Sequence, residues 1–248
     1  MIQSLSRGIE ILNFLKKRDA ASITEISLEL GISKSTASRL VGTLREYDLV
    51  QVSPVSKKYC LGYRILNLSE GVMRRINVIT VARPHLVSLM KELNESVHLS
   101  SFNNGMVYVI DQILGYKQYT LSATVGMIEP IHCSSVGKSI LAYRSASFIR
   151  KLLDRNGLVS YTRNTITDPE ALLKHLEMVR KQGYAVDNEE ITMGVKCVAT
   201  PIFLPANRIR HSIGVSGLTA DMTEHNMKSI VSKLQSACSA ISAELMNC

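Results

Sequence analysis

Two short helical patterns joined by a tight turn constrain the N-terminal part of this chain more than any other feature. Ser22 and Glu25 form the S-x-x-E pattern of a capping box, which predicts the start of a helix. Gly31 ends that helix and Ser33 is placed to cap a second one, because glycine tolerates a tight turn and serine accepts helix N–H groups. Residues 22–44 therefore predict a helix-turn-helix.

The second helix of this pair has an inward and an outward face. Ala37, Leu40, Val41 and Leu44 recur at helical intervals and are expected to face inward. The opposite face carries small hydroxyls and two cations but no carboxylate, and consists of Lys34, Ser35, Thr36, Ser38, Arg39 and Thr43. Hydroxyls and cations bind phosphates and base edges in the DNA major groove, where a carboxylate would mostly be repelled. An ordinary solvated helix usually carries Glu or Asp as well, so this face is predicted to bind DNA.

The segment after this helix, YDLVQVSPVSKKYCLGYRI, alternates as two strands around a polar turn at residues 53–57. A two-stranded hairpin is barely stable alone, so it is expected to pack on the helices as a wing. Lys57 and Lys58 lie at its tip and are predicted to contact DNA phosphates. Residues 1–64, which begin with an amphipathic helix, are therefore predicted to form a winged helix-turn-helix DNA-binding domain.

Composition narrows the class of protein and of partner. A net charge of +8 and a pI near 9.3 favour a polyanionic partner. The five cysteines are scattered without a CxxC pair, which is typical of reduced thiols in a cytoplasm. No apolar run is long enough to span a membrane, and the N-terminus lacks the apolar stretch of a signal peptide. We therefore expect a cytoplasmic protein without membrane association.

Two further helices are expected between the wing and the next strands. Apolar residues recur at helical intervals over residues 65–76, which predicts a linker helix with one apolar stripe and a dimer contact. Arg74 and Arg75 lie near the end of this helix. The next helix, residues 77–94, contains Pro84, which should bend or split it.

Residues 77–248 are predicted to form an α+β domain. Strand patterns occur in SVHLSSF, GMVYVIDQI and KQYTLSAT, and again in YAVDNEE, VKCVATPIF and HSIGVSG. Helical patterns occupy residues 136–145, 148–153 and 170–182, and a last helix begins after Thr223 and ends at Met246. Hairpin-type connections predict an antiparallel sheet, and we expect the helices to cover one of its faces.

Residues 132–139 read HCSSVGKS and partly match the phosphate-binding loop GxxxxGK[ST]. His132 stands where that loop requires a glycine, and a residue with a Cβ suits the curled backbone poorly. A nucleotide-hydrolysing enzyme is therefore the disfavoured alternative. It predicts hydrolysis that is abolished by Lys138→Ala.

The chain resembles the isocitrate lyase regulator (IclR) family of bacterial transcription factors in the order and spacing of its motifs. These are ISKSTASRLVGTL, KKYCLGYRI, IHCSSVGKSILA, GYAVDNEEITMGVKCVATPIF and IGVSGL, and the resemblance covers nearly the whole chain. It implies a homodimer or homotetramer that binds a palindromic operator in double-stranded DNA and regulates catabolic genes, with repression favoured over activation. It also implies a GAF-like C-terminal domain whose binding of a small organic acid, the effector, changes operator affinity. We expect this binding to alter the linker helix around Arg74 and Arg75, and so the spacing of the two DNA-binding domains of a dimer.

The resemblance also implies an effector-binding pocket, built from Ser134, Ser135, Val136, Asp187, Cys197, Gly214 and Ser216. Backbone N–H groups at the start of the helix that contains Gly137 would form its anion site. Cys133 and Ser135 stand where many members have Ala or Gly, and Gly214 stands where some members have a second serine. We therefore expect an effector unlike glyoxylate.

Other interpretations remain open for several of these residues. Cys197 lies in an apolar strand and would alone more often be a core residue, while Asp187 could end a solvated strand. His132, Asp187 and Cys197 are zinc-ligand types without paired spacing, and Cys197 with His132 could be a nucleophile and base if they met in space. A regulator that has lost its effector is a further alternative. The favoured interpretation has no catalytic residue, no cofactor and no metal.

Overall fold

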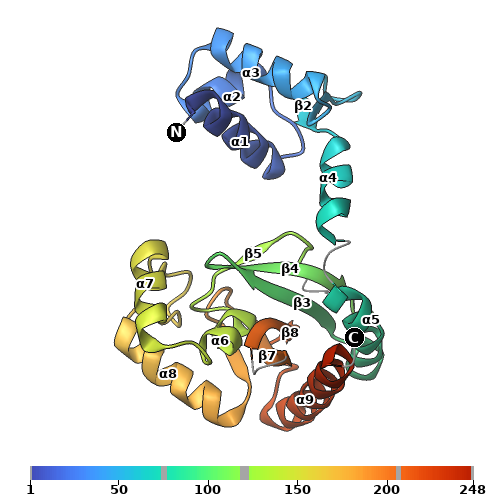
Figure 1. Ribbon diagram of the computed structural model, residues 1–248, viewed down its shortest axis with the longest axis vertical. Coiled ribbons are helices and arrows are strands. Elements are labelled where there is room, and N and C mark those ends of the chain that lie inside the picture. Colours follow the sequence, from blue (N-terminus) through green and yellow to red (C-terminus); the bar gives the residue numbers. More distant parts are fainter. Residues whose placement is uncertain (1, 74–76, 118–122, 205–207, 247–248) are drawn as a thin grey trace. The chain divides into compact units, whose positions relative to one another are not determined.

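The computed structural model describes residues 2–73, 77–117, 123–204 and 208–246, and the chain divides into two compact units, residues 1–75 and 76–248 (Figure 1). The N-terminal unit contains α1 (Gln3–Lys16), α2 (Ile23–Leu30), α3 (Lys34–Glu46), β1 (Val50–Val52), β2 (Tyr59–Leu61) and α4 (Arg64–Met73). The C-terminal unit contains a six-stranded sheet and five helices among its described residues.

Local signals position the helices of the N-terminal unit as predicted. The Ser22 hydroxyl accepts the Glu25 N–H at 3.3 Å, and the Glu25 carboxylate accepts the Ser22 N–H at 2.7 Å, which completes the capping box of α2. Gly31 ends α2 in the left-handed region at φ +60°, and the Ser33 hydroxyl caps α3 by accepting the Thr36 N–H. The predicted helix-turn-helix is therefore confirmed.

A small apolar core holds the three helices and the hairpin together. Its buried side chains come from all three helices and from β1, and include Ile11, Leu15, Ile26, Ala37, Val41 and Val50. The wing is attached to the helices by its backbone, because Ala21 and Tyr59 exchange two hydrogen bonds of 2.8 Å. The predicted winged helix-turn-helix fold is the one observed.

Helix α4 contributes no buried residue to this core. Its apolar side chains are exposed instead, with Leu66, Leu68 and Val72 all more than half accessible. The predicted dimer contact on this helix stays a prediction, and so does the assignment of residues 65–76 as a separate linker. Arg74 and Arg75 lie outside the described residues.

The sheet of the C-terminal unit is antiparallel throughout, with strand order β5-β4-β3-β8-β7-β6. The strands are β3 (Ser96–Asn103), β4 (Met106–Ile113), β5 (Ile128–Glu129), β6 (Ala185–Asn188), β7 (Val195–Leu204) and β8 (Arg208–Leu218). The helices are α5 (Asn77–Leu93), α6 (Ser135–Leu141), α7 (Ala146–Asn156), α8 (Pro169–Gln182) and α9 (Glu224–Met246). The predicted α+β class with an antiparallel sheet is therefore confirmed.

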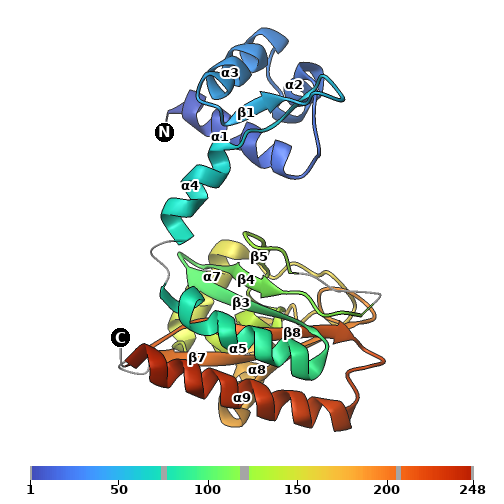
Figure 2. The ribbon, with the colours of Figure 1, turned by 90° about the vertical axis from the view of Figure 1, so that its right-hand side faces the viewer.

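Helices cover both faces of the sheet, so the expectation that they would cover one face is wrong. Helices α5 and α9 lie along one face (Figure 2) and bury an apolar cluster that includes Val97, Val198 and Val215. Helices α6, α7 and α8 belong to a second cluster, which includes Ala199 from the opposite face. The central strands do alternate, but the residues on the second face are small or polar, so this face resembles a solvated one in the sequence. Ser100 and Ser212 lie on it and are both fully buried.

Three further elements of the C-terminal unit can be compared with their predictions. Helix α5 runs through Pro84 without being split. Thr223 caps α9 as predicted, by accepting the Asn226 N–H at 3.3 Å. The short strand β5 was not predicted, and the strand predicted from KQYTLSAT falls mainly on residues 118–122, outside the described residues.

No helix in the described parts of the chain is both long and apolar enough to cross a membrane.

Candidate functional site

The predicted DNA-binding face of α3 is turned to solvent. Ala37 and Val41 are buried in the core of the N-terminal unit. On the other side the exposed side chains are Lys34, Ser35, Ser38, Arg39 and Thr43, and Thr36 is half-buried. The Thr36 hydroxyl is hydrogen-bonded at 2.9 Å to the hydroxyl of Ser33, the capping residue of α3, so one of its hydrogen bonds is already made within the protein. Contacts of these residues with DNA stay a prediction.

The two wing lysines differ in their surroundings. Lys57 is exposed in the turn, at φ +56°. The Lys58 ammonium is bonded to both carboxylate oxygens of Glu25 at 3.1 Å, and so ties the wing to the start of α2. Hydrogen bonds from the Ser22 N–H and hydroxyl, together with Lys58, lower the pKa of Glu25 to about 2. Lys57 is therefore the better candidate for a phosphate contact.

Four of the predicted effector-binding residues lie on one face of the sheet. In register, Asp187 of β6 is opposite Cys197 of β7, and Cys197 is opposite Ser216 of β8. The Cys197 thiol and the Ser216 hydroxyl are 3.2 Å apart. Gly214 lies two residues before Ser216 and so projects to the same face. The sheet thus brings together side chains from three neighbouring strands.

Helix α6 brings the other three predicted effector residues to this face. A Cβ placed on Gly214 would lie 3.0 Å from Cγ1 of Val136, so the first turn of α6 is in contact with β8. The Ser134 hydroxyl caps the helix by accepting the Gly137 N–H at 3.0 Å. Ser135 and Val136 occupy the first helical positions, whose N–H groups have no acceptor within a helix.

Burial shifts the protonation of the carboxyl groups around this face. It raises the pKa of Asp187 to about 6, against a hydrogen bond of 2.7 Å from the Glu190 N–H to its Oδ1. It raises the pKa of Glu129, on β5, to about 7, while a hydrogen bond from the Ser134 hydroxyl acts in the opposite direction. These carboxyl groups therefore titrate closer to neutral pH than exposed ones do.

Two residues of this face were missed from the sequence. His98 of β3 lies opposite Gly214 in the register, and its Nε2 is 3.3 Å from Oε1 of Glu129. Both side chains are buried. The alternation of β3 in SVHLSSF could have put His98 on the polar face of a strand, but the pairing with Gly214 depends on a register that has no local signal.

The VGKS stretch has a structural role. Lys138 is fully buried, and its ammonium pairs with the carboxylate of Glu190 in the loop after β6. A Cβ on Gly137 would lie 2.4 Å from the carbonyl oxygen of Ile131, so the glycine permits close backbone packing. A lysine held in this way cannot reach a bound phosphate, which removes the basis of the nucleotide-hydrolysis alternative.

The cysteine and metal alternatives find no support in the geometry. Burial raises the pKa of both Cys133 and Cys197 to about 12, which keeps the thiols protonated and poorly nucleophilic. Nε2 of His132 is bonded to the carbonyl oxygen of Val159 at 3.0 Å instead of to a thiol. Within the described ranges, no three His, Cys, Asp or Glu side chains are grouped closely enough to hold a metal ion.

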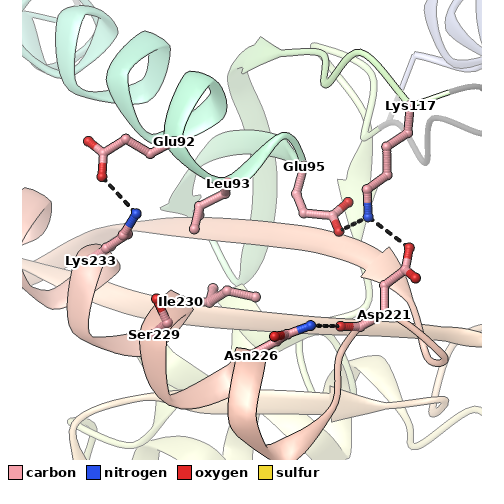
Figure 3. A pocket seen from close by; sticks show the side chains of 9 residues that line it. All are labelled: Glu92, Leu93, Glu95, Lys117, Asp221, Asn226, Ser229, Ile230 and Lys233. Carbon is pink, nitrogen blue, oxygen red and sulfur yellow. Dashed lines mark hydrogen bonds and ion pairs between the residues drawn. The ribbon is translucent and has the colours of Figure 1, made fainter.

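A separate pocket with a volume of about 290 Å³ lies between α5 and α9 (Figure 3). Its charged side chains are paired with one another: Lys117 contacts Glu95 and Asp221, and Lys233 contacts Glu92 at 3.0 Å (Figure 3). None of the seven predicted effector residues lines this pocket. The candidate effector site is instead the sheet face beside α6, because the predicted residues converge there.

Models of two protein domains match the chain. The model of the IclR helix-turn-helix domain matches residues 4–54, and that of the bacterial transcriptional regulator IclR C-terminal domain matches residues 70–243. The chain is 29% identical over 246 residues to the HTH-type transcriptional regulator XynR of Escherichia coli K12, a match that covers 99% of this chain and 98% of XynR.

Solved structures agree with these matches. The crystal structure of the Thermotoga maritima IclR is similar with a TM-score of 0.79 and 32% identity over 99% of both chains. An IclR homolog from Microbacterium hydrocarbonoxydans, crystallised in complex with 4-hydroxybenzoate, has the same fold with a TM-score of 0.83 at 21% identity, over 99% of this chain and 100% of that one. This chain belongs to the IclR family of DNA-binding bacterial transcriptional regulators.

Proposed function

We propose that this regulator represses catabolic genes and that a small organic acid, bound in its C-terminal unit, changes its affinity for the operator. The observation that carries the proposal is the convergence of Asp187, Cys197, Gly214 and Ser216 on one sheet face at the start of α6. In small-molecule sites a few convergent polar groups fix the orientation of the ligand and provide specificity. In this arrangement the N–H groups of Ser135 and Val136 would bind the carboxylate of the acid.

Each part of the chain would have its own role. Residues 1–64 would bind DNA through α3 and the wing, residues 65–76 would connect the units, and residues 77–248 would form a GAF-like effector-binding domain. The exposed apolar side chains of α4, Leu66, Leu68 and Val72, support a homodimer, with a dimer of dimers as the larger assembly. A symmetric dimer would place two α3 helices in successive major grooves of a palindromic operator.

The effector would act by binding one arrangement of the dimer better than another, since a ligand with equal affinity for both shifts nothing. The 4-hydroxybenzoate complex of the Microbacterium homolog supports an acid as ligand. Cys133 and Ser135, together with the missing side chain at Gly214, make glyoxylate a poor candidate.

Selection of bound genomic fragments by the full-length protein tests the DNA-binding part of this proposal. We expect enrichment of one palindromic sequence beside genes of catabolic enzymes. The enriched operator is then titrated with protein in the presence and absence of small acids that the neighbouring genes suggest. If no acid alters operator affinity or transcription, the effector-binding part of the proposal is wrong.

Asp187→Asn is expected to weaken effector binding by roughly tenfold to a hundredfold. The Asp187 carboxylate would accept a hydrogen bond from a donor group of the acid, and a hydrogen bond to a charged group contributes about 1.5–3 kcal/mol. The amide oxygen can still accept the Glu190 N–H that now reaches Oδ1 at 2.7 Å, so the local fold should be kept. Calorimetric titration with the acid identified above measures the loss. Operator affinity without the acid should match that of the wild type, and a parallel loss of DNA binding would contradict the assignment.

Lys57→Ala is expected to weaken binding to operator and unrelated DNA by the same factor. A lysine that contacts a phosphate adds affinity without sequence information, and its loss should reduce the slope of log affinity against log salt concentration by about 1. Fluorescence anisotropy at several salt concentrations measures both quantities. Lys17→Ala, which removes an exposed lysine outside α3 and the wing, is the control. A selective loss on the operator alone would refute the phosphate contact.

A further inference from the structure

We propose that His98 and Glu129 form a hydroxyl-binding subsite within the effector pocket, and that the effector is therefore a hydroxylated organic acid. This inference rests on the proposed function, because it adds a second contact to the proposed site, where the N–H groups of Ser135 and Val136 would bind the carboxylate. It concerns two neighbouring side chains, from β3 and β5, that were not predicted from the sequence and that lie on the side of the site away from β6.

The position of His98 explains why Gly214 is a glycine. The two residues are direct partners in the β3–β8 register. A Cβ on Gly214 would lie 2.5 Å from both Cε1 and Nε2 of His98, which is closer than real Cβ atoms approach. The imidazole therefore occupies the space that a side chain at position 214 would take. The hydroxyl that some family members carry at this position is replaced here by a ring nitrogen.

Nε2 of His98 is a buried polar atom that still needs a partner. The side chain is 4% exposed, and in the described parts of the chain this nitrogen makes no hydrogen bond. Oε1 of Glu129 is 3.3 Å away, but the two atoms lack hydrogen-bond geometry. Buried polar groups are rarely left unpaired in folded proteins, so an unpaired one at a binding site points to a ligand group.

Glu129 connects this subsite to the start of α6. Its carboxyl group accepts a hydrogen bond from the Ser134 hydroxyl, which in turn accepts the Gly137 N–H at 3.0 Å. Val136 approaches Gly214 from the same turn of the helix. A small ligand whose carboxylate lies at Ser135 and Val136 would therefore have His98 and Glu129 within reach of its other end.

A neutral hydroxyl fits this pair better than a second charged group does. Burial lowers the pKa of His98 to about 4, so the imidazole is neutral and offers either a donor or an acceptor at Nε2. A hydroxyl can accept from Nε2–H while donating to an ionised Glu129, or donate to a bare Nε2 while accepting from a protonated Glu129. A second carboxylate would meet the carboxyl groups of Glu129 and Asp187, and an ammonium would have to lose its hydration.

The test is calorimetric titration of the full-length protein with matched acids. The pairs are propanoate and lactate, butanoate and 3-hydroxybutanoate, and benzoate and 4-hydroxybenzoate, with alanine and malonate as the amine and dicarboxylate probes. We expect at least one hydroxylated acid to bind at least tenfold more tightly than its partner. His98→Phe keeps an aromatic ring and removes both nitrogens, and it should bring that ratio close to one.

Two further variants keep the test decisive. Thermal unfolding shows whether His98→Phe folds. Glu129→Gln preserves the size of the side chain and should also lower the ratio, so it provides the same test if His98→Phe does not fold. His211→Phe changes a half-buried histidine whose place in β8 alternates to the opposite sheet face, and it should leave the ratio at the wild-type value. Acids that bind without a hydroxyl preference, a preference that survives both pocket variants, or tighter binding of alanine or malonate would overturn the inference and leave the proposed function standing. Failure of every probe to bind or to change operator affinity would overturn both.

Discussion

Lys138→Met is expected to destabilise the C-terminal unit by about 3–5 kcal/mol, the usual cost of removing one partner of a buried ion pair. Lys138 is fully buried, and its loss would leave the Glu190 carboxylate buried without its cation. Methionine keeps most of the side-chain volume, so the effect reports the charge and not a cavity. For a unit of this size each kcal/mol lowers the melting temperature by about 2–4 °C.

Thermal unfolding of the full-length protein measures this effect, and two further variants show its origin. Lys151→Met removes an exposed lysine of α7 and should leave the melting temperature nearly unchanged. The double variant Lys138→Met with Glu190→Met should recover much of the lost stability, since an apolar pair of similar volume can replace a buried ion pair. A double variant as unstable as the single one would show that the carboxylate left behind is not the cause.

Lys138 also shows where short motifs mislead. The letters VGKS match part of a phosphate-binding loop, whereas the glycine permits contact with the Ile131 backbone and the lysine pairs with Glu190, more than fifty residues later in the chain. Neither partner can be read from the motif itself. The replacement of the loop's first glycine by His132 was the one local sign that argued against a nucleotide.

The N-terminal unit was predictable because its signals are local. The capping box of Ser22 and Glu25, the left-handed Gly31 and the cap at Ser33 each act within a few residues, and they fix the start and end of the helices. The alternation of Ala37 and Val41 with the exposed side chains of α3 follows from the helical period alone. The structure changed the interpretation of the wing only at Lys58, whose partner Glu25 lies in another element.

The C-terminal site was predictable only in part, because it depends on strand register. The resemblance to a known family identified Asp187, Cys197 and Ser216, and the register puts them in one row across three strands. His98 was not predicted as a site residue because its pairing with Gly214 joins residues far apart in the sequence. The second layer of helices was not predicted because the sheet face that it covers carries small and polar residues such as Ser100 and Ser212, which resemble a solvated face in the sequence.

Arg39→Ala is expected to weaken operator binding by at least about tenfold and to relax its sequence preference. A bidentate arginine contact with a base edge contributes about 1–3 kcal/mol of discrimination, and Arg39 is exposed on the carboxylate-free face of α3. Its side chain lies away from the core that Ala37 and Val41 build, so the fold of the unit should be unaffected.

Anisotropy titrations with the selected operator and with unrelated DNA separate the two contributions of Arg39. The variant should lose more affinity for the operator than for unrelated DNA, whereas Lys17→Ala, which removes the same charge outside α3, should lose little on either. Effector affinity, measured by calorimetry, should stay at the wild-type value because Arg39 and the sheet face beside α6 belong to different units. An equal loss of operator and effector binding would show that the two activities are not divided between the units as proposed.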